Sequence, residues 1–327
     1  MKVLITGGLG FIGSNLTKLL LSKKSVKKII IIDNFSKSST KYLDLFSKYK
    51  IYKSKNKYKK SNARVEVIKA DIMDYKFALK VTKNIDYVVH LAAESGVDAS
   101  INEPKKAFDI NVIGTFNYLD AARVNNIKRF IFSSSGAVFG NAKPPISEDM
   151  PRSPISPYGS SKLSIESFCE TYSSVFSINS TILRFSNAYG NYSNHKTSVV
   201  STFINRLINR QSLVINGNGE HTRDFIHVED ICSAMFKCLR NKVGSETFHV
   251  ATGNETSLNS LIRIFKESLN DEYQKNIKVI YKNPRLGDMK KNYSSIAKIK
   301  KELKWKPKYN LKDGLKSTIS WYMGEKN

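Results

Sequence analysis

Cysteine is scarce in this sequence of 327 residues. The three cysteines are Cys169, Cys232 and Cys238, and no two of them are separated by two residues. An odd and widely spaced set gives no disulfide framework, which is typical of a protein from a reducing compartment. The five histidines are scattered and have no cysteine or paired carboxylate at ligand spacing. We therefore expect no metal site and a cytoplasmic location.

Long apolar runs are also missing. No stretch approaches the roughly 18 apolar residues that a membrane-spanning helix needs. Residues 1–2 lead directly into a short apolar run at 3–6, which predicts a strand and not a cleavable signal segment. The sequence thus predicts neither a membrane span nor a secretory leader.

Acidic residues are few beside the basic ones: 28 against 53, giving a formal net charge of +25. Residues 37–64 hold nine lysines and Arg64 against one acid, Asp44. We interpret this stretch as a basic surface insertion, and the lysines elsewhere as solvated surface. A nucleic-acid-binding arm is the alternative, but no nucleic-acid module is recognisable there. We expect no nucleic-acid partner, whereas an anionic small molecule is compatible with the charge.

Strand and helix signals alternate along the first half of the chain. Helical spacing occupies residues 11–21, 105–124 and 157–176, and β-branched or apolar runs predict strands at 3–6, 29–32, 65–69, 87–91 and 129–133. This alternation predicts an α/β fold with a doubly wound parallel sheet. The expected division is residues 1–190 for this domain and 191–327 for a smaller lobe, some segments of which can return to the sheet. The helices expected in that lobe are 199–209, 228–239, 257–269 and 311–322.

A glycine run joins the first strand to the first helix. Gly7, Gly10 and Gly13 allow a tight turn and a close approach of the backbone to a pyrophosphate at the helix N-terminus. Asp33 ends the second strand, 20 residues past Gly13, where a carboxylate can bond the ribose hydroxyls of an adenosine. Since it would repel a 2′-phosphate, the pattern favours NAD over NADP and identifies the sheet as a Rossmann domain. Further residues expected around the coenzyme are Asp71, Ile72, Ala92 and Ala93.

A possible reaction centre follows downstream. Tyr158 and Lys162 are four residues apart on a helix that Ser156 and Pro157 can start, so both side chains share one face. A neighbouring ammonium favours the phenolate form of tyrosine, which at its ordinary pKa of about 10 is a poor base. Ser135, at the end of the strand near 129–133, can hold the reacting oxygen. A simple surface pair of tyrosine and lysine is the alternative.

Together these motifs resemble the extended short-chain dehydrogenase/reductase family, in particular its NAD-dependent nucleotide-sugar epimerases and dehydratases. The resemblance also rests on the segments 90–93, 133–140, 184–190, 223–228 and 284–288, and it covers nearly the whole chain. It implies a homodimer formed through helices 105–124 and 157–176. The additional coenzyme residues that it implies are Phe11, Ile12, Asn34, Leu91, Asn111, Ser133 and Phe185. The residues implied for the substrate are Ser95, Asn187, Arg223, Arg285, Asp288 and Asn292.

Two positions in the sequence favour one of the family's activities over the others. Dehydratases of the family carry an Asp-Glu pair directly after the hydroxyl residue, where this chain has Gly136 and Ala137. Neither can act as the acid or base that water elimination needs. We therefore expect an isomerase, an NAD-dependent 4-epimerase of a UDP-sugar or another nucleotide-diphosphate sugar. Asn292, where many UDP-glucose epimerases carry tyrosine, favours admission of an N-acetylhexosamine.

Several alternatives stay open. The segment 90–95 looks like that of 4,6-dehydratases, and decarboxylases and 4-keto-sugar reductases share Tyr158 and Lys162. A uronic-acid substrate is a further alternative. A non-enzymatic redox-sensing or RNA-binding protein with a Rossmann core has only the basic insertion in its favour.

Overall fold

The computed structural model describes residues 1–241, 244–269, 277–283 and 291–325. Its contacts divide the chain into two compact units. The first comprises residues 1–141, 150–184 and 232–248, and the second comprises residues 142–149, 185–231 and 249–327. The two units alternate along the sequence. Residues 232–248 belong to the first unit, although they follow residue 190, where the domain boundary is expected.

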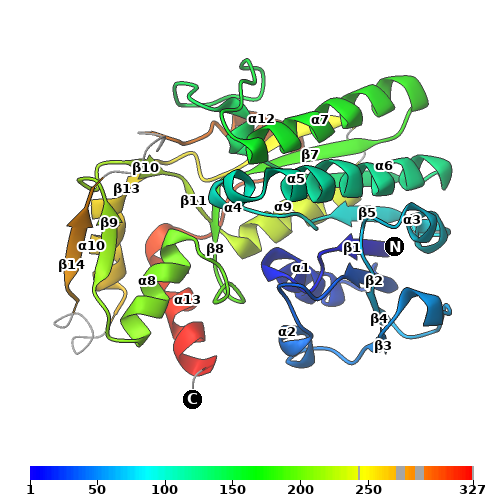
Figure 1. Cartoon of the computed structure of the whole chain (residues 1–327), viewed down its shortest axis with the longest axis horizontal. Helices are drawn as coiled ribbons and strands as arrows, with labels where there is room; N and C mark the ends of the chain where they lie inside the picture. Colours follow the sequence, from blue (N-terminus) through cyan, green and yellow to red (C-terminus); the bar gives the residue numbers. More distant parts are fainter. Residues whose placement is uncertain (242–243, 270–276, 284–290, 326–327) are drawn as a thin grey trace. The chain divides into compact units, whose positions relative to one another are not determined.

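An eight-stranded sheet forms the centre of the first unit, in the order β12-β7-β6-β5-β1-β2-β4-β3 (Figure 1). Pairing is parallel between β1 and both of its neighbours, and between the pairs β2–β4, β3–β4 and β5–β6. The predicted parallel Rossmann sheet is confirmed. The strands are β1 (Lys2–Thr6), β2 (Lys28–Asp33), β3 (Lys50–Tyr52), β4 (Val65–Lys69), β5 (Tyr87–His90), β6 (Arg129–Ser135), β7 (Ser180–Phe185) and β12 (Glu246–Val250).

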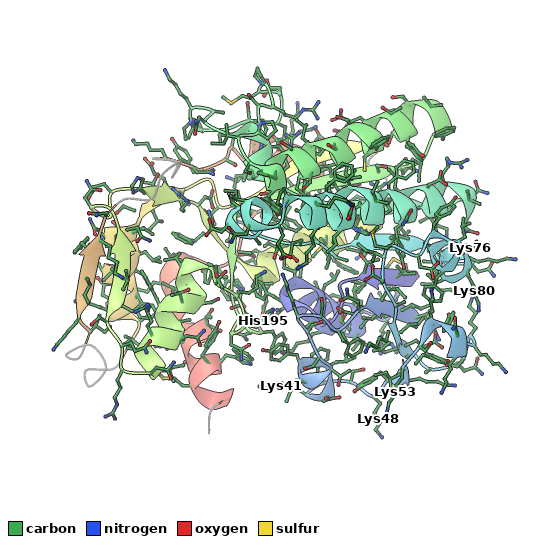
Figure 2. The ribbon with its side chains drawn as sticks, in the orientation of Figure 1. Lys41, Lys48, Lys53, Lys76, Lys80 and His195 are labelled. Atoms are coloured by element: carbon green, nitrogen blue, oxygen red, sulfur yellow. The ribbon has the colours of Figure 1, made fainter. Side chains whose placement is uncertain are left out.

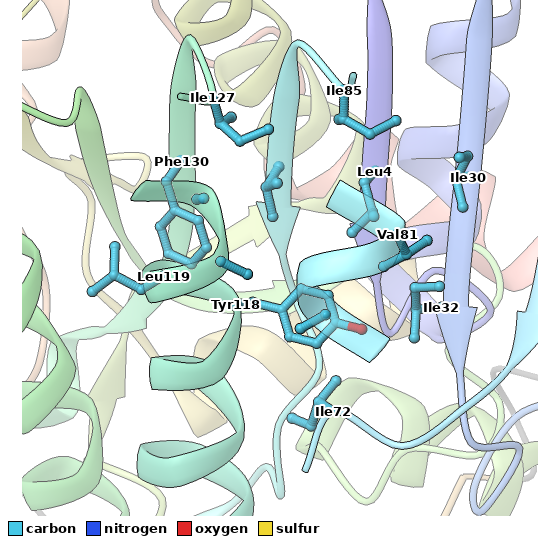
Figure 3. Close-up of a cluster of buried hydrophobic side chains, with 14 of the residues drawn as sticks. Leu4, Ile30, Ile32, Ile72, Val81, Ile85, Tyr118, Leu119, Ile127 and Phe130 are labelled. Atoms are coloured by element: carbon cyan, nitrogen blue, oxygen red, sulfur yellow. The ribbon is translucent and has the colours of Figure 1, made fainter. Parts of the chain in front are cut away.

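The isoleucine run of β2 explains why this strand lies inside the sheet. All six of its residues are buried, as a strand covered on both faces requires. Ile30 and Ile32 belong to one core cluster together with Leu4 and Phe130 (Figure 3). Side chains alternate along a strand, so Ile29 and Ile31 face the opposite layer.

Helices α3, α6 and α7 lie side by side over the cluster of Figure 3, in which Val81 of α3 and Tyr118 and Leu119 of α6 are labelled. The helix expected at 105–124 is confirmed, but its middle is a π-helical turn, η2. The helical elements of this unit are α1 (Phe11–Leu21), α2 (Lys41–Asp44), η1 (Lys55–Lys57), α3 (Tyr75–Thr82), α4 (Val97–Asn102), α5 (Pro104–Phe108), η2 (Asp109–Gly114), α6 (Thr115–Val124), η3 (Gly136–Phe139), α7 (Pro157–Phe176) and most of α9 (Val228–Arg240).

The strand order reverses beside β1. From β1 the chain proceeds outward through β2 and β4, and then crosses back to β5 on the other side of β1. In open parallel sheets the crevice at the carboxyl ends of the strands at such a switch point is the usual ligand site. The glycine turn after β1, the loop after β2 and the loop after β5 all lie at this position.

The basic insertion adds structure that the sequence did not predict. It contributes α2, η1 and the edge strand β3, which pairs with β4 through Ile51↔Val67. Tyr52 and Tyr58 are buried, with their rings edge to face at 5.2 Å. Most of its lysines are exposed, and Figure 2 shows Lys41, Lys48 and Lys53 extending from this segment. The insertion is thus held by its tyrosines while its charge stays at the surface.

The second unit has its own apolar core, formed mainly by α8, α10 and α13. Its small sheets pair β8 with β11, β9 with β14, and β10 with β13. Among the residues that the structure describes, no helix is long and apolar enough to cross a lipid bilayer. The elements are β8 (Asn187–Tyr189), α8 (Val199–Ile208), β9 (Leu213–Asn216), β10 (Thr222–Arg223), β11 (Phe225–His227), β13 (Thr256–Ser257), α10 (Leu258–Glu267), β14 (Val279–Lys282), α12 (Ala297–Leu303) and α13 (Leu311–Glu325).

Candidate active site

The glycine turn packs tightly against the end of β5. Gly7 has φ +65°, and a Cβ added there would lie 2.8 Å from the backbone nitrogen of Ala92. Both the backbone conformation and the space therefore require glycine. Gly10 caps α1, and the first amides of an α-helix have no partner within the helix. These amides and the turn form a cradle suited to a pyrophosphate.

Asp33 links this turn to the end of β2. Its carboxylate is 8% exposed and accepts hydrogen bonds from the backbone N–H of Leu9 (3.1 Å), the backbone N–H of Phe35 (3.0 Å) and the hydroxyl of Ser38 (2.8 Å). A carboxylate has about four acceptor sites, so Asp33 still has one for a ribose hydroxyl. The acceptor at this position fits an unphosphorylated ribose.

The expected adenosine end is lined partly by the insertion. A depression of about 360 Å³ is bounded by Asn34 and Asp71 on one side and by Lys53, Ser54 and Lys55 on the other. The Asn34 amide donates to the Asp71 carboxylate at 3.2 Å. The Ile72 side chain is buried in the core of Figure 3. Its expected place beside the coenzyme stays a prediction.

The loop after β5 is anchored to β1. The backbone N–H groups of Leu91 and Ala92 both donate to the Thr6 hydroxyl, at 3.2 and 3.3 Å. Ala93 is partly exposed and Ser95 is exposed. In the first helix, Phe11 is buried and Ile12 is partly exposed.

Glu94, in the same loop, forms an ion pair that sequence reasoning missed. Its side chain is 5% exposed and pairs with Lys37 and, at 3.8 Å, with Lys106. Lys37 follows β2 and Glu94 follows β5, and β1 lies between these strands. The Lys37–Glu94 pair thus connects the strand ends on the two sides of the glycine turn. The available signal was the equal spacing, four residues past each strand end.

Asn111 connects this loop to α7. It is fully buried in the π-turn η2, accepts the backbone N–H of Glu94 at 2.8 Å, and donates to the Ser161 hydroxyl at 3.1 Å. A π-turn places one extra residue in a helical turn, and such turns are frequent at functional sites. Its expected role toward the coenzyme stays a prediction, and its observed contacts join the β5 loop to α7.

Helix α7 begins as the sequence predicts. Pro157 is its first residue, and the Ser156 hydroxyl accepts the backbone N–H of Gly159 at 3.1 Å. A Cβ added at Gly159 would lie 2.5 Å from the Ala137 carbonyl oxygen, so glycine permits α7 to approach the residues after β6. This approach brings Tyr158 to Ser135.

The expected reactive side chains meet at the end of β6. Lys162 is 2% exposed, and its Nζ donates to the Ser133 carbonyl at 2.8 Å and lies 5.8 Å from the centre of the Tyr158 ring. The Ser135 hydroxyl lies near enough to Tyr158 to lower the pKa of the phenol. The Ser133 hydroxyl donates to the His90 carbonyl at 2.9 Å. The structure thus brings Ser135, Tyr158 and Lys162 together.

Burial shifts the pKa of both catalytic candidates. Loss of hydration raises the pKa of Tyr158 above its ordinary value, and the Ser135 side chain offsets only part of this rise. Burial thus outweighs the lowering expected from the neighbouring ammonium. Burial lowers the pKa of Lys162 to about 8, against the opposite effect of the Glu166 carboxylate. With a pKa of about 8, Lys162 is mainly an ammonium at neutral pH, and this charge beside the phenol favours the phenolate form of Tyr158.

Asp224 assembles the candidate substrate residues of the second unit. Its carboxylate is 1% exposed and accepts the backbone N–H and hydroxyl of Thr252 and the backbone N–H of Gly253. Its carbonyl accepts the backbone N–H of Asn187 at 2.9 Å. A backbone bond from Ser294 also reaches Asp224, and burial raises the pKa of this carboxyl.

These contacts bring together the segments that carry Asn187, Arg223 and Asn292, and sequence reasoning had not identified Asp224. Phe185, the last residue of β7, is partly exposed. Arg285 and Asp288 lie outside the described residues. Within the described ranges, no group of three or more His, Cys, Asp or Glu residues is placed to hold a metal ion.

Comparison with known proteins identifies the family. The family model described as GDP-mannose 4,6 dehydratase matches residues 4–318. The chain belongs to this family of extended short-chain dehydrogenases/reductases, whose members act on nucleotide sugars.

Individual relatives include both epimerases and dehydratases. The chain is 35% identical to a putative UDP-glucose 4-epimerase of Methanocaldococcus jannaschii, over 98% of this chain and 97% of that protein. A UDP-N-acetylglucosamine 4-epimerase from Methanobrevibacter ruminantium, solved with UDP-N-acetylmuramic acid, has a TM-score of 0.87 and 31% identity, covering 99% and 98% of the two chains. The dTDP-glucose 4,6-dehydratase DesIV of Streptomyces venezuelae, solved with NAD, has a TM-score of 0.87 and 27% identity, covering 100% and 98%.

These comparisons agree with the geometry of the coenzyme site. The glycine cradle and the free acceptor of Asp33 fit NAD, and NAD is the coenzyme of this enzyme family. The predicted cofactor is therefore confirmed. The individual contacts to it stay predictions.

Proposed function

We propose that the protein is an NAD-dependent 4-epimerase of a nucleotide-diphosphate sugar, with a UDP-hexose or UDP-N-acetylhexosamine as substrate. The observation that carries the proposal is the end of β6. Ser135 lies near Tyr158 there and lowers the pKa of its phenol, and the next two residues are Gly136 and Ala137. The site has a hydroxyl, a phenol and an ammonium, but no carboxyl group at the two positions where the related dehydratases carry their acid and base.

The chain's own residues account for the proton steps. Ser135 holds the 4-hydroxyl of the sugar, and Tyr158 as phenolate accepts its proton. Lys162, held by the Ser133 carbonyl, stabilises the phenolate. When bound, NAD would supply the redox chemistry at C4, as acceptor and then donor of a hydride on opposite faces of the sugar. Tyr158 then returns the proton to the new 4-hydroxyl.

To present both faces of its ring to the coenzyme, the sugar must rotate while its diphosphate stays bound. The site must therefore bind the diphosphate tightly and the sugar ring weakly. Arginine is suited to the first task, because its forked donors match phosphate oxygens. Arg223 is our candidate among the described residues, and Arg285, which lies outside them, is the second candidate from the family resemblance. Asn187 lies beside Arg223 through the backbone of Asp224.

A 4,6-dehydratase is the second candidate, and the segment at Glu94 is the observation in its favour. The Glu94 carboxylate, however, is nearly buried and paired with Lys37 and Lys106. These ion pairs occupy the Glu94 carboxylate, and Gly136 and Ala137 offer no acid or base in its place, which supports the epimerase over the dehydratase.

We further propose a homodimer through α6 and α7. Four aromatic rings, Phe116, Phe168, Tyr172 and Phe176, contact one another along these helices, with centroids 5.0–6.5 Å apart. Phe168 is 40% exposed and Phe176 is 49% exposed. Exposed apolar surface of this kind is typical of a protein–protein contact.

The deciding experiment is incubation of the purified protein with UDP-glucose, UDP-N-acetylglucosamine and UDP-glucuronic acid, without added reductant. NMR of the products distinguishes a 4-epimer from a 4-keto-6-deoxy sugar and from a pentose. A C4 epimer formed with only catalytic NAD is the expected result. A 4-keto-6-deoxy product, or a requirement for stoichiometric NADH, would overturn the proposal.

A further inference from the structure

A buried carboxylate lies behind the proposed catalytic pair. Glu166 is on α7, one turn past Lys162 and two turns past Tyr158, and its side chain is fully buried. Arg184 of β7 donates to both of its oxygens, from Nε at 2.9 Å and from Nη2 at 2.8 Å. Arg152, from the loop before α7, approaches the same carboxylate at 3.4 Å. Glu166 lies in the middle of α7, so these bonds do not cap an end of the helix.

Glu166 also connects α7 to β6. The Ser134 hydroxyl donates to Oε1 of Glu166 at 2.5 Å. The neighbouring Ser133 carbonyl accepts from Lys162 at 2.8 Å. Two consecutive residues of β6 are therefore bonded to two consecutive turns of α7. Ser135 is the next residue of the strand, and Tyr158 lies at the start of the helix. These two bonds therefore fix the Ser135 hydroxyl and the Tyr158 phenol relative to each other.

The charge of Glu166 acts on Lys162. The titratable groups that face Lys162 are Tyr158 and Glu166 on α7 and His90 on β5; Phe132 of β6 contributes an aromatic ring at 4.9 Å. His90 is neutral, since burial and the Lys162 charge lower its pKa to about 3. Glu166 is the carboxylate that raises the pKa of Lys162. Arg152, from the loop before α7, and Arg184, of β7, contact the same carboxylate.

We propose that Glu166 is a positioning residue for the reaction, which holds α7 against β6 through Ser134 and keeps Lys162 charged beside Tyr158. The proposal rests on the proposed roles of Tyr158 and Lys162. It explains why a carboxylate is buried between two arginines here. Replacing such a network by apolar residues is often neutral for stability, so stability alone does not account for it.

The test uses two variants with opposite predicted effects. Glu166→Gln removes a negative charge, and the loss of this charge lowers the pKa of neighbouring acids. The whole pH profile of kcat should therefore move to lower pH by about one unit. Arg152→Gln removes a partly exposed positive charge from the same carboxylate, and should move the profile to higher pH by a few tenths of a unit. KM should stay within about twofold for both. A purely structural role would give no opposite shifts.

Glu170→Gln is the matched control. Glu170 lies one turn further along α7 and also pairs with Arg152, at 2.6 Å, but its side chain is 46% exposed. This variant should keep the wild-type profile. Ser134→Ala removes the connection to β6 without changing charge, so it should lower kcat at every pH by about three- to tenfold and leave the profile in place.

Two precautions keep the outcome decisive. If Glu166→Gln fails to fold because Arg184 is left unpaired, Arg152→Gln and Ser134→Ala still carry the test. The affinity for NADH, measured by fluorescence from pH 6 to 10, can be determined without a sugar. The midpoint of its pH dependence should move to lower pH in Glu166→Gln and to higher pH in Arg152→Gln. It therefore decides the role of Glu166 even if no sugar is turned over and the proposed function fails. An unchanged midpoint in folded Glu166→Gln, or shifts of equal sign in both variants, would overturn the proposal.

Discussion

The Lys162 ammonium lies 5.8 Å from the centre of the Tyr158 ring, one turn further along α7. A cation at this distance, bonded to the Ser133 carbonyl, is fixed in place before any substrate binds. In the proposed reaction the positive charge would therefore cost no reorganisation when the phenol gives up its proton, as in a preorganised site.

Replacing the phenol should abolish turnover. In Tyr158→Phe the ring and its contacts remain but no group accepts the proton of the 4-hydroxyl, so kcat should fall by about 10²–10⁴-fold. Bound NAD should be retained, as measured by its release on denaturation. Activity close to that of the wild type would refute the assigned role.

Asp33→Asn should weaken the preference for NAD. The amide keeps the shape of the side chain but loses the charge that repels a 2′-phosphate and accepts ribose hydroxyls. Hydrogen bonds to charged groups contribute about 1.5–3 kcal/mol, so NAD affinity should fall about 10- to 100-fold while NADP affinity rises or is unchanged. Calorimetric titration with both coenzymes measures this. Asp44→Asn, in the insertion, should bind both coenzymes like the wild type.

Acid should destabilise the protein through His90. Its pKa is about 3 in the folded protein and about 6.5 when exposed, so between these values the unfolded state binds one more proton. The free energy of unfolding should therefore fall by about 1.4 kcal/mol for each pH unit below 6.5. His90→Phe keeps the stacking on Phe130 and should lose this part of the slope. Urea unfolding at pH 7, 6 and 5 compares the two proteins. Parallel slopes would contradict the assignment.

Phe168→Glu should convert a dimer to a monomer. It places a charge within the aromatic stripe of α6 and α7, where a dimer contact would bury it. Light scattering after gel filtration measures the mass. Ile280→Glu is the control, since Ile280 is 46% exposed on β14, outside the proposed contact. If Phe168→Glu and the wild type have the same mass, these helices do not form the interface.

Asn292→Tyr tests substrate selection. A tyrosine in place of the smaller amide should reduce kcat/KM for UDP-N-acetylglucosamine by about 10-fold or more, a typical effect of lost space in a pocket. The value for UDP-glucose should change little. The ratio of the two specificity constants is the measurement, and an unchanged ratio would refute the gate.

Local signals in the sequence were sufficient for the central elements. Four consecutive isoleucines predict a strand covered on both faces, and β2 is such a strand. Ser156 and Pro157 predict the start of α7 to the residue, because a cap and a first-turn proline depend only on neighbours in sequence. The approach of Tyr158 to Ser135 followed from the same helix.

Features that depend on distant residues were not predictable. The π-turn at Asp109–Gly114 has ordinary helical periodicity, and its extra residue accommodates Asn111 against Glu94 and Ser161. Glu166 is an unremarkable helical glutamate until Arg184 and Ser134 are placed beside it. Strand β3 contains only three residues within a lysine-rich stretch, too few for a pattern.

That short strand has a consequence for the behaviour of the protein at high concentration. β3 is the last strand on its side of the sheet, so its outer backbone groups could pair with another molecule. It is three residues long, begins with Lys50, and lies in a segment whose other lysines, such as Lys48 and Lys53, extend into solvent (Figure 2). Mutual repulsion of these ammonium groups opposes edge-to-edge stacking of sheets. The charge of the insertion therefore disfavours edge-to-edge association through β3.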